Sequence, residues 1–267
     1  MNIRKNLLNK DLRLKIIETI INAKEGHIPS SLSIVDIINF LYEKKIKIKS
    51  PNDNKRDIFI LSKGHGAMAL YVVLNKFGFL SNTELKKYGD SKSTLGGHPD
   101  MTKIKYVEAS TGSLGHGFCT AVGSALALKI KNKKNTVYCL TGDGECHEGT
   151  IWEAANIATN NKLNNLLNIV DVNDSAKQLM PIDNLGLKWK AFGWNVLKCN
   201  GHSNSSLNQV FKKFKKFKNH KPTVILAKTI KGMGIPFMEG HGKWHHKIPN
   251  QEEFIKVKKL LGFNEKN

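Results

Sequence analysis

The sequence predicts an α/β protein with a mostly parallel sheet and helices on both faces. From residue 110 onward, short apolar runs such as "TVYCL" and "LLNIVDV" alternate with helical stretches of about ten residues or more. Glycine-rich segments follow several of the apolar runs, namely "SKGHG", "LTGDGECHEG" and "KTIKGMG". Because ligands bind where parallel strands reach their carboxyl ends, we expect the functional site at that edge.

The N-terminal third is expected to be mainly helical. The stretch "DLRLKIIETIINAKEG" has its apolar residues on one stripe and ends at Gly26. A second helix, "SIVDIINFLYEKK", begins with Ser33 and Asp36 in the arrangement of a capping box. "DIFILSKGHG" (57–66) is typical of a short strand that runs into a glycine turn, and the helix "AMALYVVLNKFG" follows it.

The remaining two thirds are expected to alternate regularly. Helices in "GSLGHGFCTAVGSALALKIK", "GTIWEAANIATNN" and "LKWKAFG" precede strands in "TVYCLTGDG", "LLNIVDVN" and "WNVLKC". The last pair is a helix with Phe211, Phe214 and Phe217 on one buried face, followed by the strand "TVILAKTIKG". No repeat or dividing linker is visible, so we expect residues 1–267 to form one domain that starts with a helical segment at about 1–50.

The charge balance is strongly positive. The 267 residues include 42 Lys and Arg against 22 Asp and Glu, a net charge of +20. This indicates either an anionic partner, such as nucleic acid or phosphorylated metabolites, or a lysine-rich bias spread over solvated faces. The run "FKKFKKFKNHK" (211–221) favours the second interpretation, a lysine-rich bias, because its lysines are expected on the solvent-exposed face of an amphipathic helix. We therefore do not expect nucleic acid as a partner.

No signal for a membrane or an oxidising compartment is visible. No apolar run approaches the roughly 18–20 residues of a membrane-spanning helix. The N-terminal "MNIRKNLLNKDLRLK" lacks the apolar core of a signal peptide. The cysteines have no CxxC spacing and are expected as reduced thiols: Cys119, Cys139, Cys146 and Cys199. We expect a cytoplasmic protein without membrane contact.

The turn "LTGDGECHEG" (140–149) fails two common phosphate-binding patterns. A dinucleotide fingerprint needs glycine where the chain has His147, and a P-loop needs Lys and Ser or Thr where it has Thr150 and Ile151. Glu145 and Glu148 would repel a phosphate placed directly on the loop. A hard cation between the protein and a diphosphate removes this conflict.

Oxygen ligands for such a cation follow two neighbouring strands. Mg²⁺ prefers about six oxygen ligands. Asp143 can supply a carboxylate, Asn173 an amide oxygen and Ser175 a backbone carbonyl. One helix and one strand separate Asp143 from Asn173, the length of a βαβ step that brings two strand ends side by side. Gly142 and Gly144 let the backbone approach the diphosphate. This spacing is typical of thiamine diphosphate sites, although "GDG" alone is also an ordinary tight turn.

Over about residues 11–250 the chain resembles the N-terminal part of transketolase, and especially the separately encoded N-terminal subunits of two-chain transketolases. The segments that carry the resemblance occur in the family's order: "GHIPSSLSIVDIINFLY", "DIFILSKGHGAMALY", "GGHPD", "EASTGSLGHG", "LTGDGECHEGTIWEAA", "AFGW" and "KTIKGMGIPFMEG…KWHH". The resemblance implies a thiamine diphosphate-binding fold in which residues 1–267 are the diphosphate-binding domain.

The resemblance also implies site residues. The catalytic set is His27, His65, His98, His245 and Glu148. The cofactor-binding set is His65, Gly112, Ser113, Leu114, Gly142, Asp143, Gly144, Glu145, Asn173 and His245, and the metal ligands are Asp143, Asn173 and Ser175. Imidazoles suit these roles because ketol transfer moves protons near neutral pH. Glu148 and Glu153 match acids that relay protons near a subunit contact.

The implied activity is the transfer of a two-carbon ketol unit from a ketose or ketose phosphate to an aldose or aldose phosphate. The cofactors are thiamine diphosphate and Mg²⁺, with Ca²⁺ or Mn²⁺ as substitutes. In the family, the glutamate that activates the cofactor and most arginines that bind a substrate phosphate lie in the C-terminal part of the full-length enzyme. The resemblance therefore implies a separately encoded C-terminal partner subunit, in an α₂β₂ assembly.

Several alternatives stay open. Pro29–Ser30 stands where many relatives have a glycine pair, and "DSAKQLMPIDN" (174–184) replaces the usual continuation after Asn173. The chain could belong to another thiamine diphosphate enzyme: a specialised ketol or acyl transferase, or a subunit like deoxyxylulose-phosphate synthase or a 2-oxo-acid dehydrogenase. The remote alternative is a non-catalytic basic binding protein.

The other histidines are not assigned to the site. His116 and His147 are left as structural or ring-neighbour residues, and His202 and His220 are expected at the surface. His241, His245 and His246 raise the question of zinc, but the intervening glycines and flanking prolines imply no regular ligand geometry.

Overall fold

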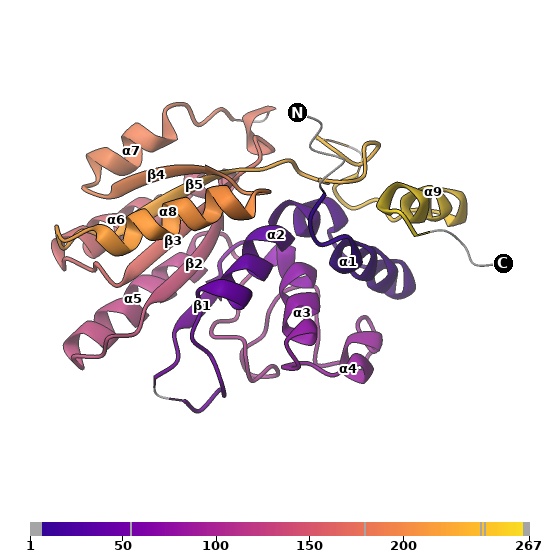
Figure 1. The fold of residues 1–267 in the computed structure, drawn as a ribbon, viewed down its shortest axis with the longest axis horizontal. Helices are drawn as coiled ribbons and strands as arrows, with labels where there is room; N and C mark the ends of the chain where they lie inside the picture. Colours follow the sequence, from indigo (N-terminus) through magenta and orange to yellow (C-terminus); the bar gives the residue numbers. More distant parts are fainter. Residues whose placement is uncertain (1–6, 54, 179, 241, 243, 264–267) are drawn as a thin grey trace.

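All strands of the sheet run parallel, as the alternating pattern predicts. The computed structural model describes residues 7–53, 55–178, 180–240, 242 and 244–263. Its sheet has the order β1-β2-β3-β5-β4 (Figure 1). The strands are β1 (Ile58–Leu61), β2 (Val137–Gly142), β3 (Leu166–Val172), β4 (Asn195–Asn200) and β5 (Thr223–Lys228). The prediction of a parallel α/β fold is confirmed.

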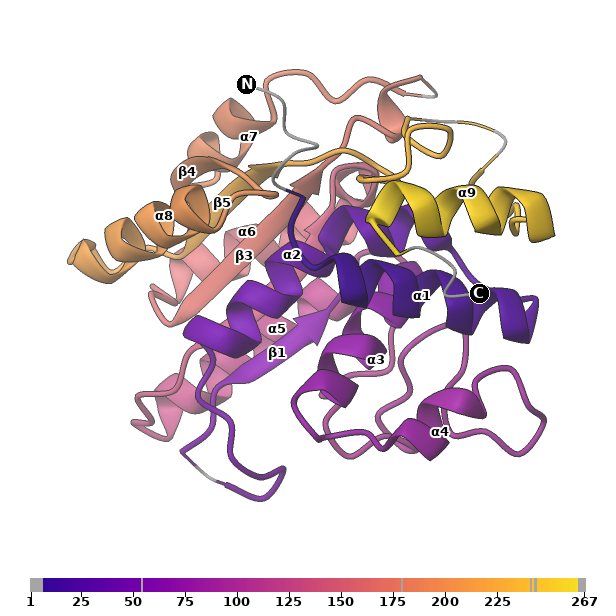
Figure 2. The same cartoon turned by 45° about the vertical axis from the view of Figure 1, so that its right-hand side comes forward.

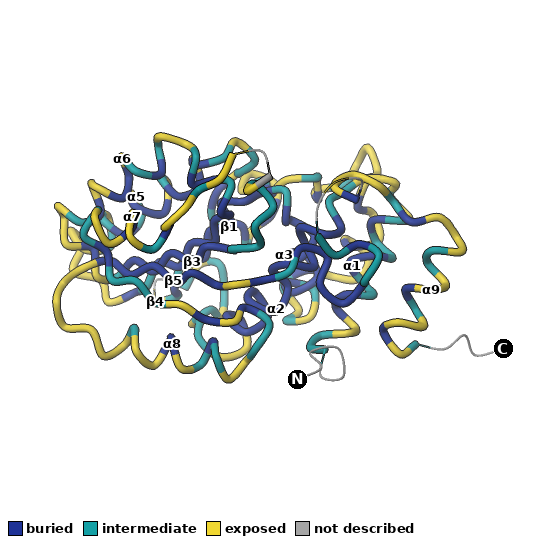
Figure 3. The backbone as a smooth tube through the Cα atoms, turned by 90° about the horizontal axis from the view of Figure 1, so that it is seen from above, coloured by how far each residue is buried: buried dark blue, intermediate teal, exposed yellow. Residues whose placement is uncertain are grey.

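Helices cover both faces of the sheet. Alternate strand residues belong to two separate apolar cores, so that Tyr138 and Leu140 face one core and Val137 and Cys139 the other. The first core includes residues of α2 (Ile28–Lys44) and α8 (Asn204–Lys216); the second includes residues of α5 (His116–Ile130), α6 (Gly149–Asn160) and α7 (Leu185–Ala191). Figure 3 shows the buried sheet between these two layers. Burial on both faces explains why the strands are almost continuously apolar.

Four further helices lie beside the sheet. They are α1 (Lys10–Ala23), α3 (Ala67–Lys76), α4 (Asn82–Lys86) and α9 (Gln251–Leu261), and α9 lies along α1 (Figure 2). The apolar periodicity predicts α1 and α3, whereas α4 and α9 were not expected. Both unexpected helices begin with a complete capping box, Ser81 with Glu84 and Asn250 with Glu253. A search for that spacing would have found them.

The capping box expected at Ser33 and Asp36 is wrong. Helix α2 already begins at Ile28, with Pro29 in its first turn, so both residues lie inside the helix and are buried. The Ser33 hydroxyl donates to the Asp171 carboxylate at 2.9 Å, and Asp36 pairs with the Arg13 guanidinium. The polar spacing reflects buried tertiary contacts rather than a helix end.

His202 and Phe217 also differ from expectation. The His202 side chain is only 4% exposed; its Nδ1 lies 2.7 Å from the Asp36 carboxylate, and its Nε2 accepts from the Ile230 amide at 2.9 Å. His202 therefore ties the segment after β5 to α2. Phe217 follows the end of α8 and is 37% exposed, so the buried face of that helix does not extend to it. His220 is exposed, as expected.

Within the described part of the chain, no helix combines the length and apolar character needed to cross a membrane. The cysteines are free thiols there, with Cys119 half-buried and Cys139, Cys146 and Cys199 buried.

Candidate active site

The candidate site is a cavity of about 390 Å³ at the carboxyl edge of the sheet. The segments that follow β1, β2, β3 and β5 all contribute to it, together with the start of α2. Its lining residues are Ser30, Lys63, His65, Leu114, Gly142, Asp143, Gly144, Glu145, His147, Asn173, Ser175, Ala176, Met180, Lys231 and His245. Most residues predicted to bind cofactor or metal are among them.

One end of the cavity carries the predicted oxygen ligands. Gly142 of β2 pairs with Asp171 of β3, which brings the two strand ends side by side as expected. Asp143 is 6% exposed, and its carboxylate accepts from the Gly144 amide at 2.8 Å and the Asp174 amide at 2.7 Å. The Asn173 amide oxygen accepts from the Ser175 amide at 2.9 Å. Asp143, Asn173 and Ser175 thus meet at one place.

Two carboxylates at this end have different electrostatic surroundings. Burial opposes the charged form of Asp171, but the adjacent Lys63 ammonium holds its pKa below the usual value, and Ser33 and Thr229 donate to the same carboxylate. Burial raises the pKa of Asp143, and the charge of Asp171 raises it further. No ion pair to Asp143 is found among the described residues, so a cation beside it would be stabilising.

A cluster of histidines adjoins the other end of the cavity, where His65 and His245 are lining residues. His27 lies at the centre of the cluster: its ring centroid is 5.7 Å from that of His65, 6.2 Å from His98, 5.3 Å from His245 and 4.3 Å from His246. These residues come from the start of α2, the turn after β1, the loop before α5 and the segment after β5. The structure therefore brings together all four histidines of the expected catalytic set and adds His246.

The central histidines are neutral at pH 7. Burial, followed by the charges of His246 and His245, lowers the pKa of His27 to about 4. Burial and the Lys63 ammonium lower the pKa of His65 to about 2. Burial and Lys231 also lower the pKa of His245. Neutral imidazoles can both donate and accept hydrogen bonds, which suits the recognition of sugar hydroxyls.

Lys231 connects the two ends of the cavity. Its ammonium contacts the Ser175 hydroxyl at 2.8 Å and His245 Nδ1 at 2.9 Å. Burial, and then the nearby Lys63 ammonium, lower the pKa of Lys231 to about 8. A lysine of this kind can hold an anionic group and can release a proton close to neutral pH.

The loop at 112–114 is packed tightly against the cavity wall. A Cβ on Gly64 would lie 2.8 Å from the Gly112 amide nitrogen, and a Cβ on Gly112 would lie 3.1 Å from the His98 ring. Gly112 also has a φ of +151°, which side chains rarely adopt. Leu114 lines the cavity, whereas Ser113 is exposed. Close packing thus fixes this loop next to His98.

Glu145 has a structural role within the chain. Its carboxylate accepts from the Ser62 hydroxyl, from the Gly115 amide at 2.8 Å and from the Gly142 amide at 3.0 Å. These bonds join the ends of β1 and β2 to the loop before α5. Glu145 also lines the cavity, so its expected part in cofactor binding stays a prediction beside these bonds.

Of the expected catalytic set, His65 and His245 line the cavity, His27 and His98 belong to the adjoining histidine cluster, and Glu148 lies outside both. It precedes the first residue of α6 and is exposed, as is Glu153 within the same helix. Of the remaining histidines, His147 lines the cavity and His116 is exposed. His241 lies outside the described residues.

Sequence reasoning missed Lys63, Asp171, Lys231, His246 and Ser30. The first three lie in the glycine-rich or polar segments "SKGHG", "VDVND" and "KTIKG", so inspection of the charged residues there would have found them. Ser30 is a lining residue of the cavity; it is 1% exposed, and its buried hydroxyl has no hydrogen-bond partner in the described chain. His246 became visible only when the fold brought it to His27.

A parallel sheet with a cavity at the carboxyl ends of its strands is typical of the class of α/β proteins that bind a ligand at that edge. Residues 3–267 match the family described as the thiamine diphosphate binding domain of transketolase. The chain belongs to this family.

Relatives and solved structures agree with this assignment. The chain is 41% identical over 255 residues to an apulose-4-phosphate transketolase subunit of Actinobacillus succinogenes, with 91% of each chain covered. It is 38% identical over 222 residues to the 6-deoxy-6-sulfo-D-fructose transketolase subunit SqwG of a Clostridium species, with 80% of each covered. A transketolase structure from Campylobacter jejuni superposes with a TM-score of 0.90 at 32% identity; it covers all of this chain, which spans 44% of that one. The predicted fold and family are confirmed.

Proposed function

We propose that this chain is the N-terminal subunit of a two-chain transketolase. It binds the diphosphate of thiamine diphosphate through Mg²⁺ and transfers a two-carbon ketol unit from a ketose or its phosphate to an aldose or its phosphate. One observation carries the proposal: a single cavity contains the buried carboxylate of Asp143, which has no ion pair among the described residues, and a cluster of five histidines adjoins the cavity and lines it through His65 and His245. The family assignment and the relatives' names support the reaction class.

The metal is proposed to bind at Asp143, Asn173 and Ser175. The donor set is one carboxylate, one amide oxygen and one backbone carbonyl, which suits Mg²⁺ and also admits Ca²⁺ or Mn²⁺. The raised pKa of Asp143 supports this assignment, because a dication would replace the missing countercharge. Gly142 and Gly144 flank Asp143 in the cavity wall and leave room for phosphate oxygens.

The diphosphate is proposed to lie between this metal and Lys231. The Lys231 ammonium is already held towards Ser175, and an anionic group there would restore its pKa towards the ordinary value. His65 lines the same cavity and, as a neutral imidazole, can donate one hydrogen bond to a phosphate or sugar oxygen. Gly112 and Leu114 would face the cofactor's rings.

The histidine end is proposed to bind the sugar and move its protons. When bound, the cofactor supplies the carbon nucleophile that cleaves and forms the C–C bond. His27, His98 and His245 hold the substrate's hydroxyl and carbonyl oxygens and exchange protons with them. The neutral state of His27 and His245 matters, because an imidazole that is not already charged can accept a proton from a hydroxyl and return it later.

The complete enzyme is proposed to be a cytoplasmic α₂β₂ assembly with a separately encoded C-terminal subunit. Two relatives whose own length this chain covers to 91% and 80% are named as subunits. Glu148 and Glu153 are exposed on the isolated chain and would meet the partner, where they can relay protons between sites. The cofactor would then lie between chains.

The test is reconstitution with a C-terminal transketolase subunit from the same organism. The purified chain, the partner and their mixture are assayed with thiamine diphosphate, Mg²⁺ and a panel of ketose and aldose phosphates and free sugars. We expect two-carbon transfer only in the mixture. Robust turnover by this chain alone would overturn the partner requirement, and a stable complex inactive across the panel would overturn the transketolase assignment.

A further inference from the structure

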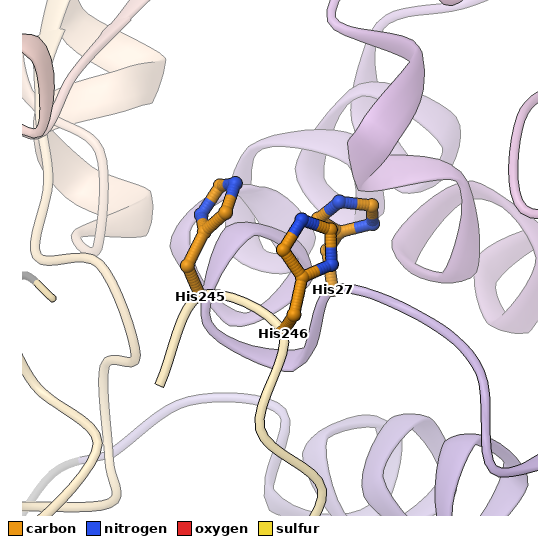
Figure 4. A group of neighbouring side chains, drawn as sticks. All are labelled: His27, His245 and His246. Carbon is orange, nitrogen blue, oxygen red and sulfur yellow. The ribbon is translucent and has the colours of Figure 1, made fainter. Parts of the chain in front are cut away.

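Three imidazoles from distant parts of the sequence converge beside the cavity. His27 immediately precedes α2, whereas His245 and His246 lie in the segment between β5 and α9. One ring nitrogen from each lies within 4.8 Å of the other two. Figure 4 shows the His27 and His246 rings close together and the His245 ring beside them, in agreement with centroid separations of 4.3 Å for His27–His246, 4.6 Å for His245–His246 and 5.3 Å for His27–His245.

Each of these rings has a nitrogen available to a ligand. His245 uses Nδ1 to contact Lys231, which leaves Nε2 for another partner. His27 Nδ1 is buried and has no hydrogen-bond partner within the described residues. A buried polar atom without a partner is uncommon and calls for an explanation, such as an ion or water that binds there. The His246 ring is exposed and can turn towards the others.

The chemistry of the cluster differs from that of the Mg²⁺ ligand set. Three imidazoles suit Zn²⁺, Co²⁺, Ni²⁺ or Cu²⁺, whereas Mg²⁺ prefers oxygen. With Zn–N distances of about 2.0–2.1 Å, nitrogens in a tetrahedral site lie roughly 3.3 Å apart. The ligand nitrogens therefore need to approach one another by at most roughly 1.5 Å, within reach of rotations of the exposed His245 and His246 side chains. Three protein ligands leave a fourth position open.

Positive charge near the cluster opposes a cation but is partly offset. Lys231 contacts His245, and Lys63 also acts on this histidine. Both lysines in turn lie in the field of the Asp143 and Asp171 carboxylates, and Lys63 is paired directly with Asp171.

We propose that His27, His245 and His246 form a binding site for a late first-row divalent cation such as Zn²⁺, and that the bound cation excludes the sugar. The binding claim stands on the geometry alone. The exclusion claim rests on the proposed function, because His27 and His245 are two of the histidines assigned there to the substrate. Occupancy by the metal removes their nitrogens from sugar recognition, so the cation acts as a reversible inhibitor.

The binding test uses the full-length chain and two matched variants. Zn²⁺ is titrated calorimetrically into wild type, His246→Ala and His220→Ala, with excess Mg²⁺ present to occupy the oxygen ligands. His220 is an exposed histidine in the loop before β5 and controls for adventitious binding. We expect one Zn²⁺ per chain in wild type and His220→Ala, and an affinity at least about tenfold lower in His246→Ala. Visible absorption with Co²⁺ reports nitrogen ligation in the same samples.

Equal Zn²⁺ affinity in wild type and His246→Ala would overturn the site. The exclusion claim is tested separately in the reconstituted enzyme, where Zn²⁺ should inhibit competitively with the ketose, release on chelation, and act at least about tenfold more weakly on His246→Ala. Inhibition that is not competitive with the ketose, or that is equally strong in His246→Ala, would overturn the claim that the bound cation excludes the sugar. If the assembly transfers no ketol unit, the proposed function fails while the calorimetric result still decides the metal site.

Discussion

The oxygen-ligand end and the histidine end of the site differ in how the chain positions their residues. The oxygen end comes from two neighbouring strand ends, and its key residues, Asp143 and Asn173, are placed by one ladder of backbone hydrogen bonds. The histidine end is assembled from four separate segments, which meet only through tertiary packing. At the first end, burial raises the pKa of Asp143, so a bound cation would stabilise its charged form. At the second end, burial lowers the pKa of His27, which is therefore neutral at pH 7. This difference predicts separable effects on cofactor binding and on turnover.

The largest effect is expected at the oxygen end. Asp143→Ala removes the only carboxylate among the proposed metal ligands, so Mg²⁺-dependent affinity for thiamine diphosphate should fall by more than about a hundredfold. Calorimetry on the reconstituted assembly measures it. Asp174→Asn is the matched control, because it retains the amide that bonds Asp143 and a residue type that tolerates its positive φ. Unchanged affinity in Asp143→Ala would show that the metal lies elsewhere.

A change at the centre of the histidine end should spare cofactor binding. His27→Gln removes a proton carrier but keeps hydrogen-bonding capacity, and we expect kcat/KM to fall about a hundredfold. The affinity for thiamine diphosphate should stay within about twofold of wild type, and His220→Gln should match wild type in both measurements. A parallel loss of cofactor affinity in His27→Gln would show that the two ends do not act separately.

A third change tests the close contact between Gly64 and Gly112, which fixes the loop at 112–114. Gly64→Ala places a Cβ 2.8 Å from the Gly112 amide, so backbone must shift, and we expect a loss of about 1–3 kcal/mol in the free energy of unfolding. Urea denaturation measures it. Gly123→Ala in α5 has no atom within 4 Å of its new Cβ and should be neutral or slightly stabilising. Equal stability of Gly64→Ala and wild type would mean that the loop moves freely.

The smallest expected effect is the dependence of stability on pH. The pKa of His65 is lowered to about 2 in the folded chain, against about 6.5 when unfolded, so below pH 6.5 the unfolded state binds a proton that the folded state does not. Stability should therefore fall as the pH drops from 7 to 5. In His65→Gln this loss should be smaller by about 1 kcal/mol. Identical pH profiles for the two proteins would show that His65 is not held neutral.

The same contrast explains what could be predicted from sequence. Asp143, Gly142 and Asn173 lie at strand ends, and the lengths of the intervening helix and strand place those ends side by side. The role of Lys231 depends on a contact with Ser175, and that of His246 on its distance from His27, neither of which is encoded in local spacing. Ser33 and Asp36 were misassigned for the same reason: their partners, Asp171 and Arg13, are remote in sequence.

The contact between Arg13 and the far end of the chain has a kinetic consequence. The Arg13 guanidinium donates to the Met233 carbonyl at 2.8 Å across 220 positions of sequence, and His202 bridges Asp36 to Ile230 nearby. Closing such long loops is entropically costly and slow, so these contacts should form late in folding. The histidine cluster depends on the same segment. A growing or partly folded chain would therefore lack the sugar-binding end, and the site would mature only after nearly all of the chain has been made.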